Sequence, residues 1–551
     1  MRGPGRLSGA RIRRWTGAAL CCICLAVSAL AAEPSPLPGF RQLEAAGAVI
    51  GKVRIETDNI FDLDNPKEDN PLFRLANAIH VKTRPSVIRR ALLFKSGDKV
   101  SARRIEETER LLRGSGYLYS AQIRPIAVHD GVVDVEVRTR DTWSLEPGIS
   151  FSRAGGNNTS GLTLRDTNFL GTGVTLGYSR SSDPDRRGHK IEFSHHQLFG
   201  DRSSLDYSRA DYSDGYARSI ALAHPFYALE TPWAAGVSAR NFSQIESLYS
   251  GGVEAAQYRH RQRQGQVFGG LSSGLKQGWV QRYSAGLAYQ DDRYSLEPGR
   301  PAPARLPEDQ TLAYPFLRYE LIEDKTLTVT NHDLIGRPEY FDLGLHVAVQ
   351  LGRSSAGLGA TRSPWLYSAS VAKGVQTPGG GQTLGAFGLS GEVEDGRATR
   401  QFYHSSLRFY LPHSHFRLFY ASATLAALVR PGPTDQLLLG GDSGLPGYPS
   451  RYQSGTRRAL FRLEERFYTD LYLYRLVRVG AAAFFDVGRA WGGAYQGATN
   501  DGWLRDVGFG LRLVSDRAAN GNVLHMDVAF PLDAQGDVKR AQFLVKTYSA
   551  F

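Results

Sequence analysis

Residues 141–551 alternate between apolar and polar side chains, and this period of two is the feature that most limits the fold of the chain. Short alternating segments such as 176–179, 190–193 and 285–289 are separated by Gly, Asp, Asn and Ser, which favour turns. After the N-terminal segment no run of apolar residues is long enough for a helical membrane span. The pattern predicts a fold made mainly of β-strands.

The last predicted strands each have one apolar face and one face of small or charged residues. Along residues 477–487 every second side chain is apolar, while the other positions hold mostly small residues together with Arg478 and Asp486, and segments 506–513 and 524–530 are similar. Lipid on one side and water on the other explains such strands. A soluble β-sandwich also has one apolar face, but it does not need about 400 residues of alternating sequence. We therefore predict a transmembrane antiparallel β-barrel over residues 141–551.

The N-terminus has the pattern of a secretory signal peptide, which we assign to residues 1–31. Five arginines precede an apolar run from Trp15 to Leu30, and residues 29–31 have the small-x-small form of a cleavage site. A transmembrane anchor is the alternative, although about 16 apolar residues are short for a span. All three cysteines lie in this segment, so we expect no disulfide and no thiol chemistry in the mature chain. They are Cys21, Cys22 and Cys24.

The charge of the chain gives no argument for nucleic-acid binding. The 66 basic and 54 acidic residues give a formal charge of +12, and removing the five arginines of residues 1–31 leaves 61 basic residues and an excess of +7. Such a small and dispersed excess does not make a basic binding surface. After the signal segment there is no Cys/His cluster, no phosphate-binding loop and no dinucleotide motif. We therefore expect no cofactor, no metal site and no enzymatic activity.

Residues 49–140 have a mixed pattern that predicts a small α+β domain, and the proline-rich residues 32–48 before it are expected to form a linker. Alternation predicts strands at 49–55, 121–128 and 133–140, and a tight turn of His129-Asp130-Gly131 joins the last two.

Two helices are expected between the first and second of these strands. Pro85 opens one helix, and Ser101 can cap the other, which Gly114 ends. A sheet with both helices on one face would bury Val133, Val135 and Val137 of the last strand.

The Asp- and Asn-rich residues 58–70 allow two interpretations. Their carboxylates could belong to a calcium loop, but the spacing Asp62-x-Asp64 runs into Pro66 and lacks the glycine of such a loop. We interpret the segment as a solvated acidic loop.

Residues 440–455 form a glycine- and proline-rich loop with about five predicted strands after it. Leu445-Pro446-Gly447-Tyr448 occupies its middle. Two segments follow, one with Arg462, Glu464 and Arg466 and one with Phe484, Asp486 and Gly488. The loop and the two segments, in this order, resemble the outer-membrane BamA/TamA/FhaC superfamily of bacterial surface antigen barrels. Residues 49–140 resemble a single POTRA domain, the polypeptide-transport-associated module.

The resemblance implies where these residues lie. In the family the loop folds back into the barrel lumen and carries a Val/Leu-Arg-Gly-Phe/Tyr tip, which this chain matches at three of four positions. The two segments match a Glu-x-Arg type wall strand and a Phe-x-Asp-x-Gly wall strand. Alternation puts Arg462, Glu464, Arg466 and Asp486 on the polar face, so all four can meet the loop inside the lumen.

The departure from the family is Pro446, which stands where the tip arginine would pair with the wall aspartate. Pro-Gly suits the central positions of a type II turn, so the tip can keep its shape while the charge pair is lost. We expect Arg451 to take over the pairing with Asp486. The alternative is a surface-exposed loop with a solvated Arg451.

The resemblance implies an outer-membrane protein of a Gram-negative cell that inserts or translocates polypeptides, with a POTRA domain in the periplasm receiving unfolded clients. Its partners would be outer-membrane lipid, client chains and periplasmic accessory proteins, with no nucleic acid. A passive channel or a lipid-handling barrel is the alternative. Counting alternating segments gives roughly 20 strands, but the family has 16, and we expect about 16. Phe551 is the aromatic C-terminus typical of such barrels.

Overall fold

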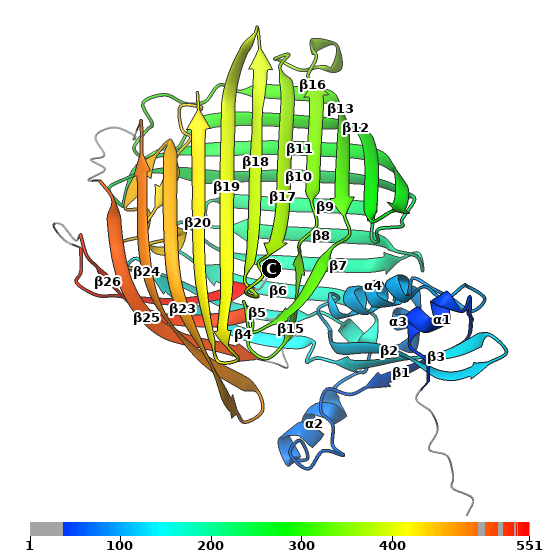
Figure 1. Cartoon of the computed structure of the whole chain (residues 1–551). Coiled ribbons are helices and arrows are strands. Elements are labelled where there is room, and N and C mark those ends of the chain that lie inside the picture. Colours follow the sequence, from blue (N-terminus) through cyan, green and yellow to red (C-terminus); the bar gives the residue numbers. More distant parts are fainter. Residues whose placement is uncertain (1–36, 494–501, 516–521, 534–535, 537, 550–551) are drawn as a thin grey trace, which may run out of the picture.

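A closed barrel of 20 antiparallel strands forms most of the molecule (Figure 1). The computed structural model describes residues 37–493, 502–515, 522–533, 536 and 538–549. Each wall strand pairs with the wall strands before and after it in the chain, and β27 closes the barrel against β4. The wall strands are β4 (Leu145–Ala154), β5 (Asn157–Asp166), β6 (Val174–Ser182), β7 (Arg187–Leu198), β8 (Ser203–Tyr212), β9 (Gly215–His224), β10 (Trp233–Ser250), β11 (Val253–Lys276), β12 (Trp279–Leu296), β13 (Gln310–Glu323), β16 (His346–Arg353), β17 (Trp365–Gln376), β18 (Gln382–Glu394), β19 (Arg397–Ser414), β20 (Arg417–Val429), β23 (Arg457–Leu473), β24 (Val477–Trp491), β25 (Leu504–Ser515), β26 (Asn522–Pro531) and β27 (Gln542–Ser549).

The expected number of about 16 strands is wrong, because the described wall contains 20. The count of alternating segments was the better guide, since the extra hairpins continue the same hydrogen-bonded ladder. The strands differ in length as well. β10, β11 and β12 have 18, 24 and 18 residues, whereas β9 has 10.

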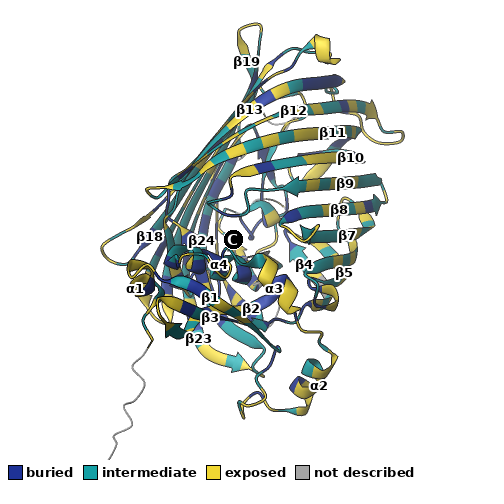
Figure 2. Ribbon diagram, turned by 90° about the vertical axis from the view of Figure 1, so that its right-hand side faces the viewer, coloured by how far each residue is buried: buried dark blue, intermediate teal, exposed yellow. Residues whose placement is uncertain are grey.

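The cross-strand register gives every wall residue an outward or an inward position. Outward positions carry exposed apolar side chains, as at Ile191 on β7, Leu287 on β12 and Phe509 on β25. Inward positions include the buried charged residues Asp486 and Arg512. Figure 2 shows the resulting alternation of exposure along β7–β11. The predicted separation of an apolar and a polar face therefore holds around the barrel.

Four short strands and three 3₁₀ turns complete the described part of the chain after residue 141. β14 pairs with β15 and β21 pairs with β22, each pair forming a sheet separate from the wall. These elements are β14 (Thr326–Thr330), β15 (Pro338–Asp342), β21 (Leu437–Leu439), β22 (Gln453–Gly455), η1 (Phe169–Gly171), η2 (Ala356–Leu358) and η3 (Gly441–Ser443).

An α+β unit precedes the barrel and lies at one end of it (Figure 1). Its sheet has the order β1-β3-β2, with β1 parallel to β3 and β2 antiparallel to β3. The predicted hairpin is confirmed, with positive φ at Asp130 and Gly131, and the valines at 133, 135 and 137 are completely buried. The elements are α1 (Phe40–Ala45), β1 (Val49–Asp58), α2 (Pro71–Ile79), α3 (Pro85–Ala91), α4 (Ala102–Arg113), β2 (Leu118–His129) and β3 (Val132–Asp141).

The helices of this unit were predicted only in part. α4 begins after Ser101, whose side chain accepts a hydrogen bond from the Arg104 amide, and it ends at Gly114 as predicted. The expected linker 32–48 instead contains α1, because Leu43 packs into the core of the unit. α2 was missed, although Asn70 caps it and Pro71 starts it.

The unit is attached to the barrel through the turns that face it. The Arg84 amide donates to the carbonyl of Gly171 at 2.9 Å, in the turn between β5 and β6. Glu230, between β9 and β10, pairs with Arg103 and with Arg104 of α4, the latter at 2.6 Å. Arg110 of α4 donates to the Thr326 hydroxyl at 3.0 Å, which links the unit to β14.

Every helix in the described ranges is too short or too polar to cross a membrane. The predicted signal peptide 1–31, including its cysteines, and Phe551 lie outside the described residues.

Candidate functional site

The lumenal loop, residues 430–456 between β20 and β23, folds back into the barrel and packs on the inner face of β23–β25. Leu445 and Tyr448 at its tip are completely buried. They form a hydrophobic cluster with Leu439 of β21, Ala490 of β24 and Leu504 of β25. The loop therefore occupies the place that the family resemblance implies, and the surface-exposed alternative does not hold.

The tip is a turn, but not the type II turn that we predicted. The Tyr448 amide donates to the carbonyl of Leu445 at 3.1 Å, which closes the turn over Pro446 and Gly447. A type II turn needs positive φ at its third residue, and Gly447 does not have it. Leu445, two residues earlier, adopts a positive φ of 61° instead.

Close backbone approach explains the glycine at position 447. Its amide donates to Oδ2 of Asp506 on β25 at 2.8 Å. A Cβ at this position would lie 2.8 Å from Cβ of Asp506 and 3.0 Å from the backbone nitrogen of Pro531. The Tyr448 hydroxyl donates to the Arg505 carbonyl at 2.9 Å. The tip thus fits the wall only without a side chain at 447.

Gly488 of the Phe-x-Asp-x-Gly strand also makes room for the lumenal loop. A Cβ at Gly488 would lie 3.1 Å from side-chain carbons of both Leu439 and Leu445. The missing side chain leaves room for the buried leucines of the loop.

Arg462, Asp486 and Asp506 stand directly opposite one another on β23, β24 and β25. Arg462 donates to both carboxylate oxygens of Asp486, at 2.7 and 2.6 Å. Its guanidinium also lies 5.2 Å from the ring centre of the buried Phe484. The wall therefore supplies its own arginine to the aspartate, and the tip meets this row through Asp506.

The predicted pair of Arg451 and Asp486 does not form. Arg451 has a φ of 61° and contacts the opposite wall, where it donates to both carboxylate oxygens of Asp185, at 2.7 and 2.5 Å. It also contacts the Tyr249 hydroxyl, and its guanidinium lies 4.2 Å from the Tyr249 ring centre. Because Asp486 is already held by Arg462, Arg451 is left to attach the loop to the β6–β7 turn and to β10.

The pKa values of Arg451 and Asp185 are consistent with an ion pair between them. The hydrogen bond to Asp185 raises the pKa of Arg451 above its ordinary value. Burial works to raise the pKa of Asp185, but the hydrogen bonds from Arg451 and Tyr249 outweigh it and lower the pKa. Both groups therefore stay charged in the folded loop.

Glu464 and Arg466 of the first wall motif belong to a second charged row. Glu464 is 2% exposed and lies 3.4 Å from Arg466 and 3.3 Å from Arg512 of β25. Arg512 in turn pairs with Asp527 of β26. Opposite charges alternate through the row, which limits the cost of burying them.

A second element in the lumen was not predicted. The lumenal hairpin, residues 326–342 with β14 and β15, packs through Ile335 and Phe341 on inward residues of β19, β20, β23, β25 and β26. Asp333 at its turn accepts a hydrogen bond from the Tyr410 hydroxyl at 2.9 Å and pairs with Arg466 at 3.0 Å. Arg466 thus connects the wall motif to the hairpin, a contact between residues 133 positions apart.

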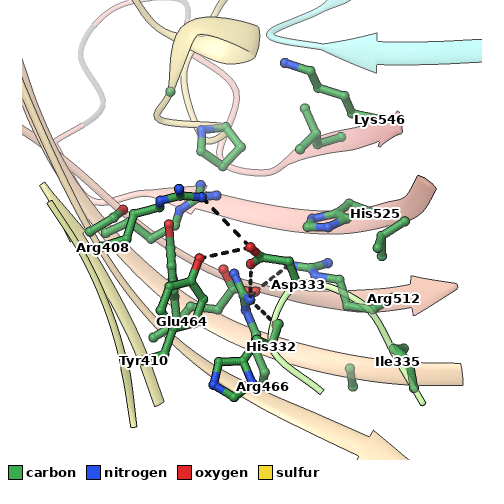
Figure 3. A pocket seen from close by; sticks show the side chains of 18 of the residues that line it. His332, Asp333, Ile335, Arg408, Tyr410, Glu464, Arg466, Arg512, His525 and Lys546 are labelled. Carbon is green, nitrogen blue, oxygen red and sulfur yellow. Dashed lines mark hydrogen bonds and ion pairs between the residues drawn. The ribbon is translucent and has the colours of Figure 1, made fainter. Parts of the chain in front are cut away.

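A cavity of about 320 Å³ remains between the lumenal loop and the lumenal hairpin (Figure 3). Pro446 lines it from the loop and Asp333 from the hairpin. In the described residues no group of three or more His, Cys, Asp or Glu side chains could hold a metal ion. The charged wall residues around the cavity are Arg408, Arg462, Glu464, Arg466, Arg512 and Lys546, and His525 also lines it.

The barrel closes through a seam between β27 and β4 that is weakly paired. In the described residues these strands share one residue pair, Val545 with Arg153, whereas β26 and β27 share eight. The lumenal loop contacts both sides of the seam. Ser450 Oγ donates to the carbonyl of Ala154 at the end of β4, at 2.8 Å, and Lys546 of β27 donates to the carbonyl of Asp442 at 3.1 Å.

The structure brings together most of the residues chosen from the sequence. The tip and both wall motifs lie within one connected site, whereas the Arg451 side chain contacts Asp185 and Tyr249 on the other side of the lumen. Sequence reasoning missed Asp185, Tyr249, Asp333 and Asp506. Of these only Asp506 had a usable signal, because it follows the wall motif on the polar face of the next strand.

Comparisons with known proteins give structural similarity alone. No family model and no curated protein matches the sequence. BamA from Haemophilus ducreyi lacking POTRA domains 1–3 is 11% identical with a TM-score of 0.40, and the match covers 91% of this chain and 85% of that one. CdiB from Acinetobacter baumannii is 13% identical, with a TM-score of 0.43 and coverages of 91% and 74%. CdiB from Escherichia coli is 12% identical, with a TM-score of 0.47 and coverages of 90% and 76%.

Proposed function

We propose that this chain is an outer-membrane barrel of the BamA/TamA/FhaC superfamily that inserts or translocates polypeptides. The N-terminal unit would be its POTRA domain and would receive clients in the periplasm. The observation that carries the proposal is the seam, which has one residue pair in the described part of the chain and is contacted on both sides by the lumenal loop.

Membrane placement follows from the outward face of the wall. Apolar side chains such as Leu164 on β5, Leu317 on β13 and Leu425 on β20 are about half exposed or more. Soluble proteins rarely expose apolar surface all around their perimeter. Lipid around the barrel removes that surface from water, as in outer-membrane barrels.

The weak seam gives polypeptides a physical route. Opening it exposes the unpaired backbone groups of β4 and β27, which can pair with an extended client strand. In lipid an unpaired backbone group costs several kcal/mol, so each client strand that pairs there is strongly stabilised. No covalent chemistry is needed for this step.

The N-terminal unit is in position to deliver such a strand. Its sheet has β1 and β2 at its edges, and edge strands can accept an extended peptide. Because α3 and α4 are attached to the turns of the barrel, a client on the sheet would remain close to the lumen and the seam.

A passive channel or a lipid-handling barrel is the competing function. A passive channel needs a continuous aqueous path, and both the lumenal loop and the lumenal hairpin lie inside this barrel. Their presence favours the insertase or translocase.

A disulfide across the seam tests the proposal. The described residues contain no cysteine, so Arg153→Cys with Val545→Cys would join β27 to β4 at their one residue pair. The matched control is Val528→Cys with Phe543→Cys, which joins β26 to β27 at an ordinary pair. Quantitative comparison of outer-membrane and secreted proteomes would report client transport in cells carrying each variant.

We expect the oxidised seam variant to lose the same few β-rich proteins that are lost without the gene product, and reductant to restore them. The control should match the parent. If the locked barrel supports a normal proteome, the seam is not the route. If removing the protein leaves the proteome unchanged, polypeptide transport is not its main role.

A further inference from the structure

A cluster of positive charge lies on the outward face of β6–β9. We call Arg180, Arg187, His189, Arg209 and Arg218 the basic cluster, and all five side chains are exposed. They share the outward face with apolar residues of the same strands, such as Tyr178 and Ile191.

The register places like charges beside each other. Arg209 of β8 and Arg218 of β9 are direct cross-strand partners and carry like charges. Arg180 of β6 is the partner of His189 of β7, which adds no charge when its imidazole is neutral. Like charges in direct opposition destabilise a sheet. The cluster therefore gains from an anion that lies over it.

One acidic side chain offsets only part of this charge. Asp211 contacts Arg209 at 2.9 Å and His189 at 3.7 Å. Within the described part of the chain, Arg180, Arg187 and Arg218 have no acidic partner in an ion pair. With His189 neutral, four arginines and one aspartate leave an excess of three positive charges.

A surface groove of about 360 Å³ runs through the cluster. Arg180, Arg187 and His189 line it together with Asp211, and Tyr178 forms an aromatic side. The groove thus combines guanidinium donors with an aromatic wall.

The groove opens beside apolar surface. On β8 the outward neighbour of Arg209 is Tyr207, and on β9 the outward neighbour of Arg218 is Ile220, both of which are exposed. A lipid bound here could place its acyl chains on these apolar residues and its headgroup on the cluster.

We propose that this groove binds the phosphate group of a membrane lipid. The proposal rests on the membrane placement of the barrel and adds a lipid-binding site to it. Guanidinium groups bind phosphate oxygens by charge-assisted hydrogen bonds, often two at a time. The exposed Tyr178 ring suits the boundary between headgroups and acyl chains, and the strands beside the groove keep the acyl chains next to the wall.

Native mass spectrometry of the full chain in detergent tests the site. The probe is phosphatidic acid, with phosphatidylcholine of the same acyl chains as the comparison. The variant Arg180→Gln, Arg187→Gln, Arg218→Gln removes three charges without touching the Asp211 contacts. The matched control Arg41→Gln, Arg54→Gln, Arg89→Gln removes three exposed charges from the N-terminal unit.

The parent and the control should bind phosphatidic acid at least about tenfold more tightly than phosphatidylcholine, and the groove variant should lose this preference. Equal binding of both lipids by the parent, or an unchanged preference in the groove variant, overturns the proposal. Displacement of phosphatidic acid by an equimolar amount of inorganic phosphate would identify a site for free anions and would also overturn it. Client transport by the groove variant, measured as above, separates this result from the function of the seam.

Discussion

Arg462 and Asp486 stand opposite each other on β23 and β24, and the arginine donates to both oxygens of the completely buried carboxylate. Asp506 continues the row on β25 and accepts the amide of Gly447. The wall arginine thus provides the charge that the proline at the loop tip cannot. The loop needs only its backbone to dock beside this pair.

Arg462→Met should destabilise the barrel, because it leaves Asp486 buried without its partner. Removing one member of a buried pair costs about 3–5 kcal/mol, whereas replacing both members by apolar residues is often neutral. We expect urea unfolding in detergent, followed by tryptophan fluorescence, to show a loss of about 3 kcal/mol for the single variant. Arg462→Met with Asp486→Leu should recover most of it. A single variant as stable as the parent would contradict this role for the pair.

Gly447→Ala should release the loop tip from the wall. The added Cβ would meet Cβ of Asp506 and the Pro531 backbone, and overpacking of this kind costs about 1–3 kcal/mol. We expect higher conductance in planar bilayers, since each 1.4 kcal/mol makes the undocked loop about tenfold more populated. Gly432→Ala in the same loop is the control, because its Cβ would face only the movable Asp435 carboxylate. Equal conductance of the two variants would show that the tip does not restrict the lumen.

Arg451→Ala should weaken the attachment of the loop to the β6–β7 turn by about 1–3 kcal/mol, because it removes two charge-assisted hydrogen bonds. Arg451→Lys should recover only part, since lysine cannot contact both Asp185 oxygens with a planar fork. Hydrogen exchange of residues 434–454 would measure the change. If these residues are equally protected in Arg451→Ala and in the parent, the contact does not stabilise the loop.

The same contact predicts a dependence on acid. The pKa of Asp185 is lowered from its ordinary value of 3.8 in the folded loop. Its contribution to stability is therefore present above pH 3.8 and is lost as the pH falls through the lowered pKa. Loop protection should fall at acid pH in the parent and should change less in Arg451→Ala.

Glu339 predicts the opposite dependence for the lumenal hairpin. It accepts the amides of His332 and Asp333 at 2.9 and 2.8 Å, and burial, helped by the charge of Asp333, raises its pKa to about 7. The folded hairpin holds this proton more tightly than the unfolded chain does. Its contribution is therefore complete below the ordinary value of 4.5 and is lost as the pH rises through about 7.

Hydrogen exchange of residues 331–336, expressed as protection factors, measures this effect. The protection should decrease from pH 6 to pH 8 by up to about tenfold in the parent. Glu339→Gln keeps a neutral acceptor and should abolish the pH dependence. A parent whose protection does not change over this range would show that Glu339 does not govern the seating of the hairpin.

The sequence was a reliable guide to most features that a local pattern determines, although α2 with its Asn70 cap was missed and the type II turn was wrong. Alternation separated inward from outward residues, as it did for Asp486 and Phe509. The caps at Ser101 and Gly114 located α4 correctly. The number of alternating segments also indicated 20 strands, and the error came from preferring the number typical of the family.

Local patterns could not identify contacts across the lumen. Arg451 and Asp185 are 266 residues apart, and no feature of either segment indicates that they meet. In the sequence the lumenal hairpin resembles an ordinary connection between β13 and β16. Its position depends on the inward residues of β19–β26 on which it packs.

By itself the sequence determined that this chain forms a barrel with an apolar exterior, because each strand needs only its own alternation to divide lipid from water. Through the family resemblance it also indicated the tip and the two wall motifs, but not Asp506, on which the tip docks. Closure of the barrel decided the rest. It brought β27 to β4 at the seam, put the hairpin inside and set Arg451 against Asp185, because these contacts depend on the circumference and register of the whole sheet.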